Sequence, residues 1–261
     1  MYGKLNYKDM SSKKQKFVKE LICGMSDLHG FLPKVKPCGI VVICGDIFPL
    51  SIQHDLSACE RWLLNDFKNW AEDLPCKSVV LIAGNHDLYF EKYGKYIAEN
   101  DEAKISDKII YLQDSSCYVE GLHIYGCPWC TGPFGWPFCP DEHMPDVNEK
   151  YKAIPDCDIL LTHQPPKVAD LGCSYPGDLY RMKDFGSDRL LNAIYDKKII
   201  ANFCGHIHSG QHNGVQYPVI GHDTMYYNVS ILDENYAQTY APTYVSIDIE
   251  NRTAERLSIY D

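Results

Sequence analysis

Five short segments of this chain combine acidic, amide and imidazole side chains in patterns that could bind metal ions. The segments, each of which follows an apolar run, are Asp27-Leu28-His29, Gly45-Asp46, Gly84-Asn85-His86-Asp87, Thr162-His163 and Cys204-Gly205-His206-Ile207-His208. Mixed ligands of these types suit transition-metal ions of intermediate softness. Two such ions close together can clamp a phosphate and activate a bound water as a nucleophile. We therefore predict a two-metal phosphoester hydrolase.

The spacing within two segments places pairs of ligands on one side of an extended chain. Residues i and i+2 of a strand point the same way, so Asp27 and His29 could face one ion. The same argument applies to His206 and His208, although a turn could send these imidazoles to different ions. Asp46 could bridge two ions, because the preceding glycine allows close backbone approach. Each segment alone is also typical of a polar turn, so the prediction depends on their combination.

The tetrad from Gly84 to Asp87 is the most specific local signal. Asn85 offers a neutral carbonyl ligand, and His86 could donate a proton to a leaving oxygen as a general acid. Asp87 could fix the tautomer of His86. The alternative is a Gly-Asn turn that carries a surface histidine.

Apolar runs and one amphipathic pattern indicate alternating strands and helices. The predicted strands cover 21–25, 40–44, 78–82, 109–112, 122–126, 158–163, 199–204, 226–231 and 244–249. Helices are predicted over 55–74, with Asp55 as N-cap, and over 187–197. Five runs end in candidate ligands, and sites of open α/β sheets lie beyond the carboxyl ends of strands.

Composition limits the organisation and the partners. The 261 residues are 45% apolar with a formal net charge of −10. We predict a peripheral arm over 1–20 and a single domain over 21–261. The acidic balance argues against a broad nucleic-acid or anionic-membrane surface, and no apolar run is long enough to span a membrane. A small phosphorylated substrate remains compatible, because bound metals dominate the charge inside a site.

Twelve cysteines occur in a chain whose first twenty residues lack the apolar core of a signal peptide. We interpret them as reduced thiols of a cytoplasmic protein. The pair Cys127-x-x-Cys130 could indicate a redox motif or structural zinc, but the surrounding pattern lacks the elements of either. This loop also contains Trp129 and Trp136, which could form a wall or lid over a substrate or simply pack as a surface loop.

Taken in order, the ligand motifs resemble those of the calcineurin-like metallophosphoesterase superfamily over residues 27–208. The stretch 126–138 is similar to the Gly-x-Pro-Trp…Gly-Trp-x-Phe segment of one branch, the metallophosphoesterase-domain-containing, class III phosphodiesterase-like proteins. Residues 158–166 and 227–230 fit that branch too. The chain lacks the Asp-Arg-Gly that follows Gly-Asp in serine/threonine protein phosphatases, which argues against that activity.

The resemblance implies an α/β fold, a four-layer αββα sandwich with two central mixed β-sheets. Metal one would be held by Asp27, His29 and His208, metal two by Asn85, His163 and His206, with Asp46 as the bridge. His86, assisted by Asp87, would protonate the leaving group. Asn228, Trp129 and Trp136 are expected to contact the substrate.

We therefore expect a metal-dependent phosphodiesterase that acts on a small or nucleotide-like phosphoester. A metal-bridging hydroxide would attack phosphorus in line. The two ions, divalent or trivalent, could be Mn, Fe, Zn, Co or Ni. The alternatives are a phosphomonoesterase or nuclease of the same fold, or a non-catalytic interaction scaffold that retains the metals. The oligomeric state is left open.

Overall fold

The computed structural model describes residues 19–132, 135–140, 146–175, 178, 182–219 and 222–258. Residues 1–18 of the predicted arm lie outside these ranges, and the first strand begins at Glu20. The arm and the single domain over 21–261 therefore stay predictions. All twelve cysteines are free thiols, as expected, and Cys23, Cys44 and Cys204 are fully buried in strands.

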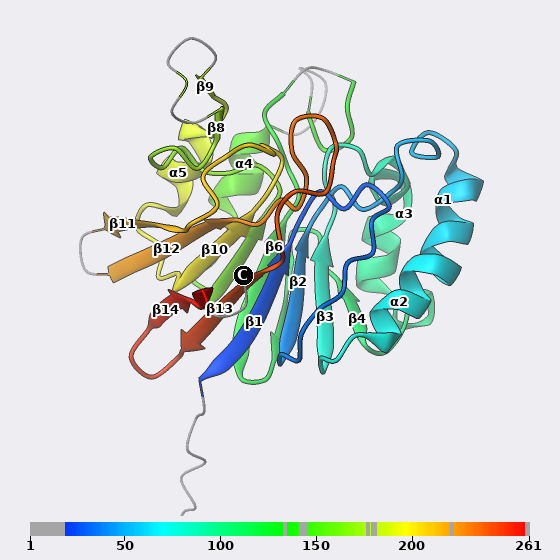
Figure 1. The fold of residues 1–261 in the computed structure, drawn as a ribbon, viewed down its shortest axis with the longest axis horizontal. Coiled ribbons are helices and arrows are strands. Elements are labelled where there is room, and N and C mark those ends of the chain that lie inside the picture. The colour runs from blue at the N-terminus through cyan, green and yellow to red at the C-terminus, as the bar shows by residue number, and fades with distance from the viewer. Residues whose placement is uncertain are drawn as a thin grey trace, which may run out of the picture.

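The first of two central sheets is formed by the N-terminal half of the chain and its C-terminal hairpin (Figure 1). Its strands are β1 (Glu20–Met25), β2 (Ile40–Cys44), β3 (Ser78–Ile82), β4 (Ile109–Tyr111), β13 (Thr243–Asp248) and β14 (Thr253–Arg256). They lie in the order β14-β13-β1-β2-β3-β4. Strands β1 to β4 are parallel, whereas β13 pairs antiparallel with both neighbours, so the sheet is mixed.

The second sheet also has six strands and mixed pairing. Its strands are β5 (Ser115–Val119), β6 (Leu122–Cys127), β7 (Ile159–Thr162), β10 (Ala201–Cys204), β11 (Val215–Val219) and β12 (His222–Asn228). Their order is β11-β12-β10-β7-β6-β5, with parallel pairs in the centre and antiparallel pairs at both edges. A small hairpin of β8 (Cys173–Ser174) and β9 (Lys183–Asp184) is separate from both sheets.

The apolar runs predicted as buried strands fill two layers of core. In β2, Ile40 and Val42 pack between the sheets with Leu161 and Phe203 of the second sheet. Val41, which points to the opposite side of the strand, packs in the core that also contains helix residues. A strand that is covered on both faces buries every side chain, which is why the apolar runs of these strands are continuous.

Helices cover the outer face of each sheet (Figure 1). They are α1 (Leu56–Trp62), the π-helical η1 (Leu63–Phe67), α2 (Lys68–Asp73), α3 (Leu88–Glu99), the 3₁₀ turn η2 (Asp101–Ala103), α4 (Val147–Lys152) and α5 (Asp188–Ile194). The first three run continuously, which confirms the predicted helix over 55–74, and the Asp55 carboxylate accepts from Ala58 N–H at 3.0 Å. The result is the expected four-layer αββα sandwich.

The two sheets meet at the carboxyl ends of their parallel strands. Ser26, directly after β1, and Ser230, just beyond β12, form a parallel bridge that joins the sheets there. The loops that leave both sheets at this edge therefore converge. Among the helices that the structure describes, none combines the length and apolar character needed to cross a bilayer.

Candidate metal centre

All seven predicted ligands lie together beyond the carboxyl ends of five parallel strands. They follow β1, β2, β3, β7 and β10 and are Asp27, His29, Asp46, Asn85, His163, His206 and His208. Six of the seven are buried, and His206 is half-buried. Because three of the strands belong to the first sheet and two to the second, the cluster exists only where the sheets pack together.

Four of these residues have left-handed backbone conformations. The φ angles are 55° at Asp27, 40° at His29, 54° at Asp46 and 67° at His206. This region costs a non-glycine residue on the order of 1–3 kcal/mol and is concentrated at functional sites, where the surrounding structure holds it in place. The turns therefore aim the side chains at one point, at some cost to stability.

Two glycines allow the segments to approach each other. Gly45 has a φ of 98°, and a Cβ there would lie 2.7 Å from the carbonyl oxygen of Ala83. A Cβ on Gly84 would collide with the Asp46 carboxylate and lie 2.6 Å from Cε1 of His163. The expected close approach at Gly45 is confirmed, and Gly84 is needed for the same reason.

The first ligand group consists of Asp27, His29 and His208. One ligand atom from each lies within 4.8 Å of the others. His208 donates through Nδ1 to the carbonyl of Asp233 at 2.9 Å, and its Nε2 lies 3.5 Å from Oδ1 of Asp27. The Asp27 carboxylate also accepts the backbone N–H of His206 at 3.0 Å. These contacts fix which nitrogen of His208 faces the group.

The second ligand group consists of Asn85, His163 and His206. His163 donates through Nδ1 to the carbonyl of Cys44 at 2.7 Å, while its Nε2 lies 2.9 Å from Oδ1 of Asn85. The rings of His163 and His206 are 5.0 Å apart between centroids. A backbone carbonyl that orients a ligand histidine through its other nitrogen is a common feature of metal sites.

Asp46 lies between the two groups. Its Oδ2 is 3.7 Å from Nε2 of His29 and 3.3 Å from Nε2 of His163. Its other oxygen accepts the backbone N–H of His86 at 2.7 Å, which holds the carboxylate in this orientation. One carboxylate oxygen therefore faces an imidazole of each group, as a bridging ligand should.

Charge and burial act in opposite directions on the carboxylates and imidazoles. Burial raises the pKa of Asp27 and of Asp46, but nearby histidines outweigh it and hold both pKa values below the usual range. Conversely, burial would lower the pKa of His163 and His208, yet the two carboxylates raise these pKa values to about 10 and about 9. Both carboxylates are therefore ionised at neutral pH and surrounded by groups that compensate their charge.

The donor set fits metal ions. Both ring nitrogens of His29 are buried and have no hydrogen-bond partner, which is costly for a polar group unless a ligand satisfies it. Burial lowers the pKa of His29 to about 4, so its ring is neutral and has a lone pair available. Oxygen and imidazole ligands together accept Mn, Fe, Co, Ni or Zn.

His86 lies beside the first ligand group. Its ring is 4.9 Å from that of His29 in an edge-on arrangement. Its Nδ1 lies 2.6 Å from Oε1 of Gln53, so Gln53 accepts the Nδ1–H and Nε2 is the nitrogen available to a ligand. Nothing in the local sequence pattern identified Gln53, which is 33 residues away.

The expectation that Asp87 fixes the tautomer of His86 is wrong. The buried Asp87 carboxylate instead accepts four backbone N–H groups at 2.8 to 3.4 Å. The donors are the backbone N–H groups of Asp46, Ile47, Phe48 and Gly84. Asp87 therefore ties the loop after β2 to the loop after β3 and positions Asp46.

Two of the three residues expected to contact the substrate have structural roles. Asn228 is fully buried, donates to the carbonyls of Leu171 and Ile207, and accepts the N–H of Ser230. The side-chain amide of Asn228 donates to and accepts from backbone groups. These hydrogen bonds stabilise the loop after β10. The structure gives Asn228 a backbone-holding role, and its contact with substrate stays a prediction.

The two tryptophans of the Pro- and Gly-rich loop have different surroundings. Trp129 is buried, and its indole N–H donates to Asp114 at 2.8 Å while Lys150 lies over its ring. It packs as core, and its contact with substrate stays a prediction. Trp136 is half-buried and lies edge-on to His86 with centroids 4.6 Å apart, so it does border the site. Residues 133 and 134 of this loop lie outside the described residues.

One aromatic residue at the site, Tyr236, was not expected from the sequence. The ring of Tyr236 lies 5.0 Å from that of His29 and 5.1 Å from that of His208, edge-on to both. It is 39% exposed, so part of the side chain is accessible to a ligand. Its position depends on the loop after β12, and no spacing in the sequence connects it with the ligands.

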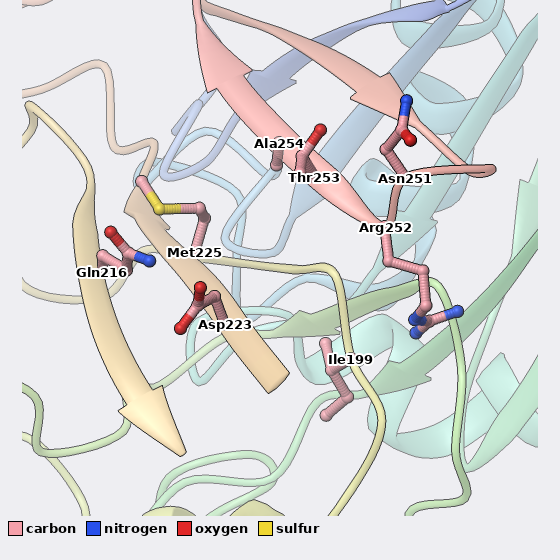
Figure 2. A pocket seen from close by; sticks show the side chains of 8 residues that line it. All are labelled: Ile199, Gln216, Asp223, Met225, Asn251, Arg252, Thr253 and Ala254. Carbon is pink, nitrogen blue, oxygen red and sulfur yellow. The ribbon is translucent and has the colours of Figure 1, made fainter. Parts of the chain in front are cut away.

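A surface pocket of about 350 Å³ lies elsewhere (Figure 2). Ile199, Asp223 and Arg252 are among its lining residues, and none of the predicted ligands lines it. Ile199 precedes β10 and Asp223 lies near the start of β12, so this pocket is at the opposite end of the strands from the metal centre.

The structure combines a four-layer αββα sandwich with Asp, Asn and His side chains gathered at the shared carboxyl edge, an arrangement that fits a metal-dependent hydrolase. The family profile described as Calcineurin-like phosphoesterase matches residues 21–210. The chain therefore belongs to the calcineurin-like phosphoesterase family and is a metal-dependent phosphoesterase. This confirms the resemblance found in the sequence.

Relatives and a solved structure agree with this assignment. Metallophosphoesterase domain-containing protein 1 of Homo sapiens is 30% identical over 251 residues, which cover 85% of this chain and 69% of that protein. The Mus musculus protein of the same name matches with the same identity and coverage. One crystal structure superposes with a TM-score of 0.59 at 14% identity and covers 92% of this chain and 99% of its own, which supports the fold alone.

Proposed function

We propose that this chain is a phosphodiesterase that acts on a small or nucleotide-like substrate at a centre of two metal ions. The observation that carries the proposal is the position of Asp46, whose Oδ2 lies near an imidazole nitrogen of each ligand group. The first ligand group would hold one ion, the second would hold the other, and Asp46 would be shared. When bound, the ions would supply Lewis acidity and the activated water that serves as nucleophile.

The residues around the ions divide the remaining work. His86 would donate a proton from Nε2 to the leaving oxygen, while Gln53 holds the ring through Nδ1. Burial lowers the pKa of His86, which makes it a readier proton donor in its protonated form. Trp136 on the His86 side and Tyr236 on the side of the first ligand group would flank the substrate, and both rings could stack on a base.

Charge favours a diester over a monoester. A phosphate monoester carries close to two negative charges at neutral pH, whereas a diester carries one. Among the described residues, the ion pairs of Asp27 and Asp46 are with histidines alone, and no lysine or arginine pairs with either. The two carboxylates thus bring no lysine or arginine with them that could pair with a second substrate charge.

The test is hydrolysis by metal-stripped protein to which Mn, Co, Ni, Zn or Mg is added back singly. We expect bis(p-nitrophenyl) phosphate to be cleaved with a higher kcat/KM than p-nitrophenyl phosphate, and only after a metal is restored. His86→Ala should bind the metals and lose turnover on diesters with poor leaving groups. Full activity of that variant on such a diester would contradict the acid role of His86.

The other outcomes identify the rival functions. Preference for the monoester would indicate a phosphomonoesterase. Cleavage of DNA or RNA with strongly salt-dependent binding would indicate a nuclease. Two bound metals without turnover on any phosphoester, together with tight binding of a protein partner, would indicate an interaction scaffold.

A further inference from the structure

Cys130 lies next to the second ligand group. It follows β6, whose last residue Cys127 pairs with Thr162 of β7, directly before His163. The backbone N–H of Cys130 donates to the carbonyl of Phe138 at 2.9 Å, which holds these two parts of the chain together. The side chain is fully buried there.

The sulfur of Cys130 and one ring nitrogen each of His163 and His206 all lie within 4.8 Å of one another. With Zn–S and Zn–N bonds of about 2.3 and 2.1 Å, sulfur and nitrogen ligands of one ion are about 3.6 Å apart at the tetrahedral angle and about 4.4 Å apart when opposite. The atoms lie within 4.8 Å of one another, a bound slightly wider than this range, so side-chain shifts would bring all three onto one ion.

The charge of the second ligand group gives a reason for a further ligand. The amide of Asn85 and the two imidazoles are neutral ligands, and Asp46 is shared with the other ion. The first ligand group, by contrast, has a second carboxylate in Asp27, which pairs with His208 although it also lies near His163. A thiolate would supply the second ion with an anionic ligand that it does not share.

We propose that Cys130 is a thiolate ligand of the ion held by the second ligand group, and that it directs this position to zinc, iron or cobalt rather than manganese or magnesium. The proposal rests on the proposed two-metal centre. On binding, the thiol releases its proton to solvent and the sulfur lone pair forms the bond to the ion, so no oxidant is needed. Soft thiolate ligands favour zinc and iron over manganese and magnesium.

The other thiols of the loop do not share this geometry. Cys127 is equally buried, but it belongs to none of the clusters of metal-ligand atoms found among the described residues. The thiol partner of Cys130 is Cys139, not Cys127. The Cys-x-x-Cys spacing is therefore not a thiol pair. Cys127 serves as the matched buried control, and Cys139 shows whether the neighbouring thiol contributes.

The test is the absorption spectrum of metal-stripped protein titrated with Co(II). We expect a near-ultraviolet thiolate-to-cobalt charge-transfer band together with visible d–d bands in the natural chain. The charge-transfer band should disappear in Cys130→Ser and persist in Cys127→Ser and Cys139→Ser, while the d–d bands persist in all. Cadmium NMR of the unaltered chain gives the same answer without a variant, because sulfur ligation moves the resonance far downfield.

Competition between metals is the second readout. Cys130→Ser should lose about tenfold to a hundredfold in zinc affinity, with a smaller change for manganese, as expected when a soft ligand is removed. Cobalt d–d bands without a charge-transfer band in the natural chain, or a band that survives in Cys130→Ser, would overturn the ligand proposal alone. Failure to bind cobalt at all would overturn the metal centre as well.

Discussion

The two ligand groups lie side by side but differ in charge. The first contains its own buried carboxylate, Asp27, which is held by the backbone N–H of His206. The second contains the amide of Asn85 and two imidazoles, and it obtains a carboxylate only by sharing Asp46. The protein would thus neutralise more of the charge of an ion in the first ligand group than of an ion in the second. The difference predicts unequal affinities, unless Cys130 supplies the missing anionic ligand.

Each group also draws on both sheets. Asp27 and His29 follow β1 of the first sheet, whereas their partner His208 follows β10 of the second. Asn85 follows β3 of the first sheet, and His163 follows β7 of the second. Neither sheet can assemble either group alone, so metal binding should depend on correct packing between the sheets.

The largest effect is expected from Asp46→Asn, because this carboxylate serves both groups. The variant should bind less than its normal complement of metal and lose about a thousandfold or more in kcat/KM, which corresponds to several kcal/mol of charge stabilisation. Metal analysis after gel filtration and diester kinetics measure both losses. Asp55→Asn is the control, since either residue can cap α1. Normal metal content in Asp46→Asn would show that the groups bind independently of the shared carboxylate.

The next effect separates catalysis from metal binding. His86→Gln should keep both metals and lose about a hundredfold in kcat on a diester with a poor leaving group, as is typical for a general acid. Burial lowers the pKa of His86 from its usual value of about 6.5, so its protonated fraction falls as pH rises through that lower pKa. The rate ratio of natural chain to variant should therefore decrease with increasing pH. A ratio independent of pH would exclude the acid role.

A pair of isosteric substitutions tests the charge difference itself. Asp27→Asn should lower the affinity of the first ligand group for its ion by about tenfold to a hundredfold, the range seen when the surroundings of a metal ligand are disturbed. Asn85→Asp adds a charge to the second group and should leave two metals bound. Isothermal titration of the stripped variants with zinc measures both. Equal losses in the two variants would mean that ligand charge does not distinguish the groups.

The smallest effect is expected at Gln53, which acts through its contact with His86. Gln53→Leu should lower kcat by about tenfold or less through loss of ring orientation, with metal content unchanged. Gln53→Glu keeps the hydrogen-bond acceptor and adds a negative charge, which should raise the pKa of His86. The pH dependence of kcat should therefore shift to higher pH. Unchanged profiles in both variants would show that the Gln53 contact does not position His86.

Strands with continuous apolar runs were predicted correctly, because burial on both faces leaves an obvious pattern. The edge strands β5, β11 and β14 were missed, and in β5 and β14 several residues are exposed and follow no apolar run. Helix α3 was also missed, because it begins directly after the site tetrad and only three of its residues, Tyr89, Phe90 and Gly94, are buried. Local pattern therefore identifies the core elements better than the periphery.

Side-chain partners were predicted less well than ligand types. Asp87 and Asn228 have donors and acceptors suited to catalysis or substrate binding, yet backbone groups satisfy them. Trp129 has an aromatic ring suited to a substrate wall, yet it packs in the core against Asp114 and Lys150. The residue type determines which interactions a side chain can make, and its neighbours in the fold determine which of those interactions form.

The sequence by itself determined the chemistry that is available and the places where it appears. Acidic, amide and imidazole residues directly after five apolar runs were sufficient to predict a metal centre at the carboxyl ends of strands. Only the tertiary structure decided which donors share a group, that Gln53 rather than Asp87 partners His86, and that Cys130 lies beside His163 and His206. The contact between Asp27 and His206 spans 179 residues and depends on how two sheets pack. Local spacing fixes the direction of a side chain within its own strand, but it contains no information about which loop of the other sheet that side chain will meet.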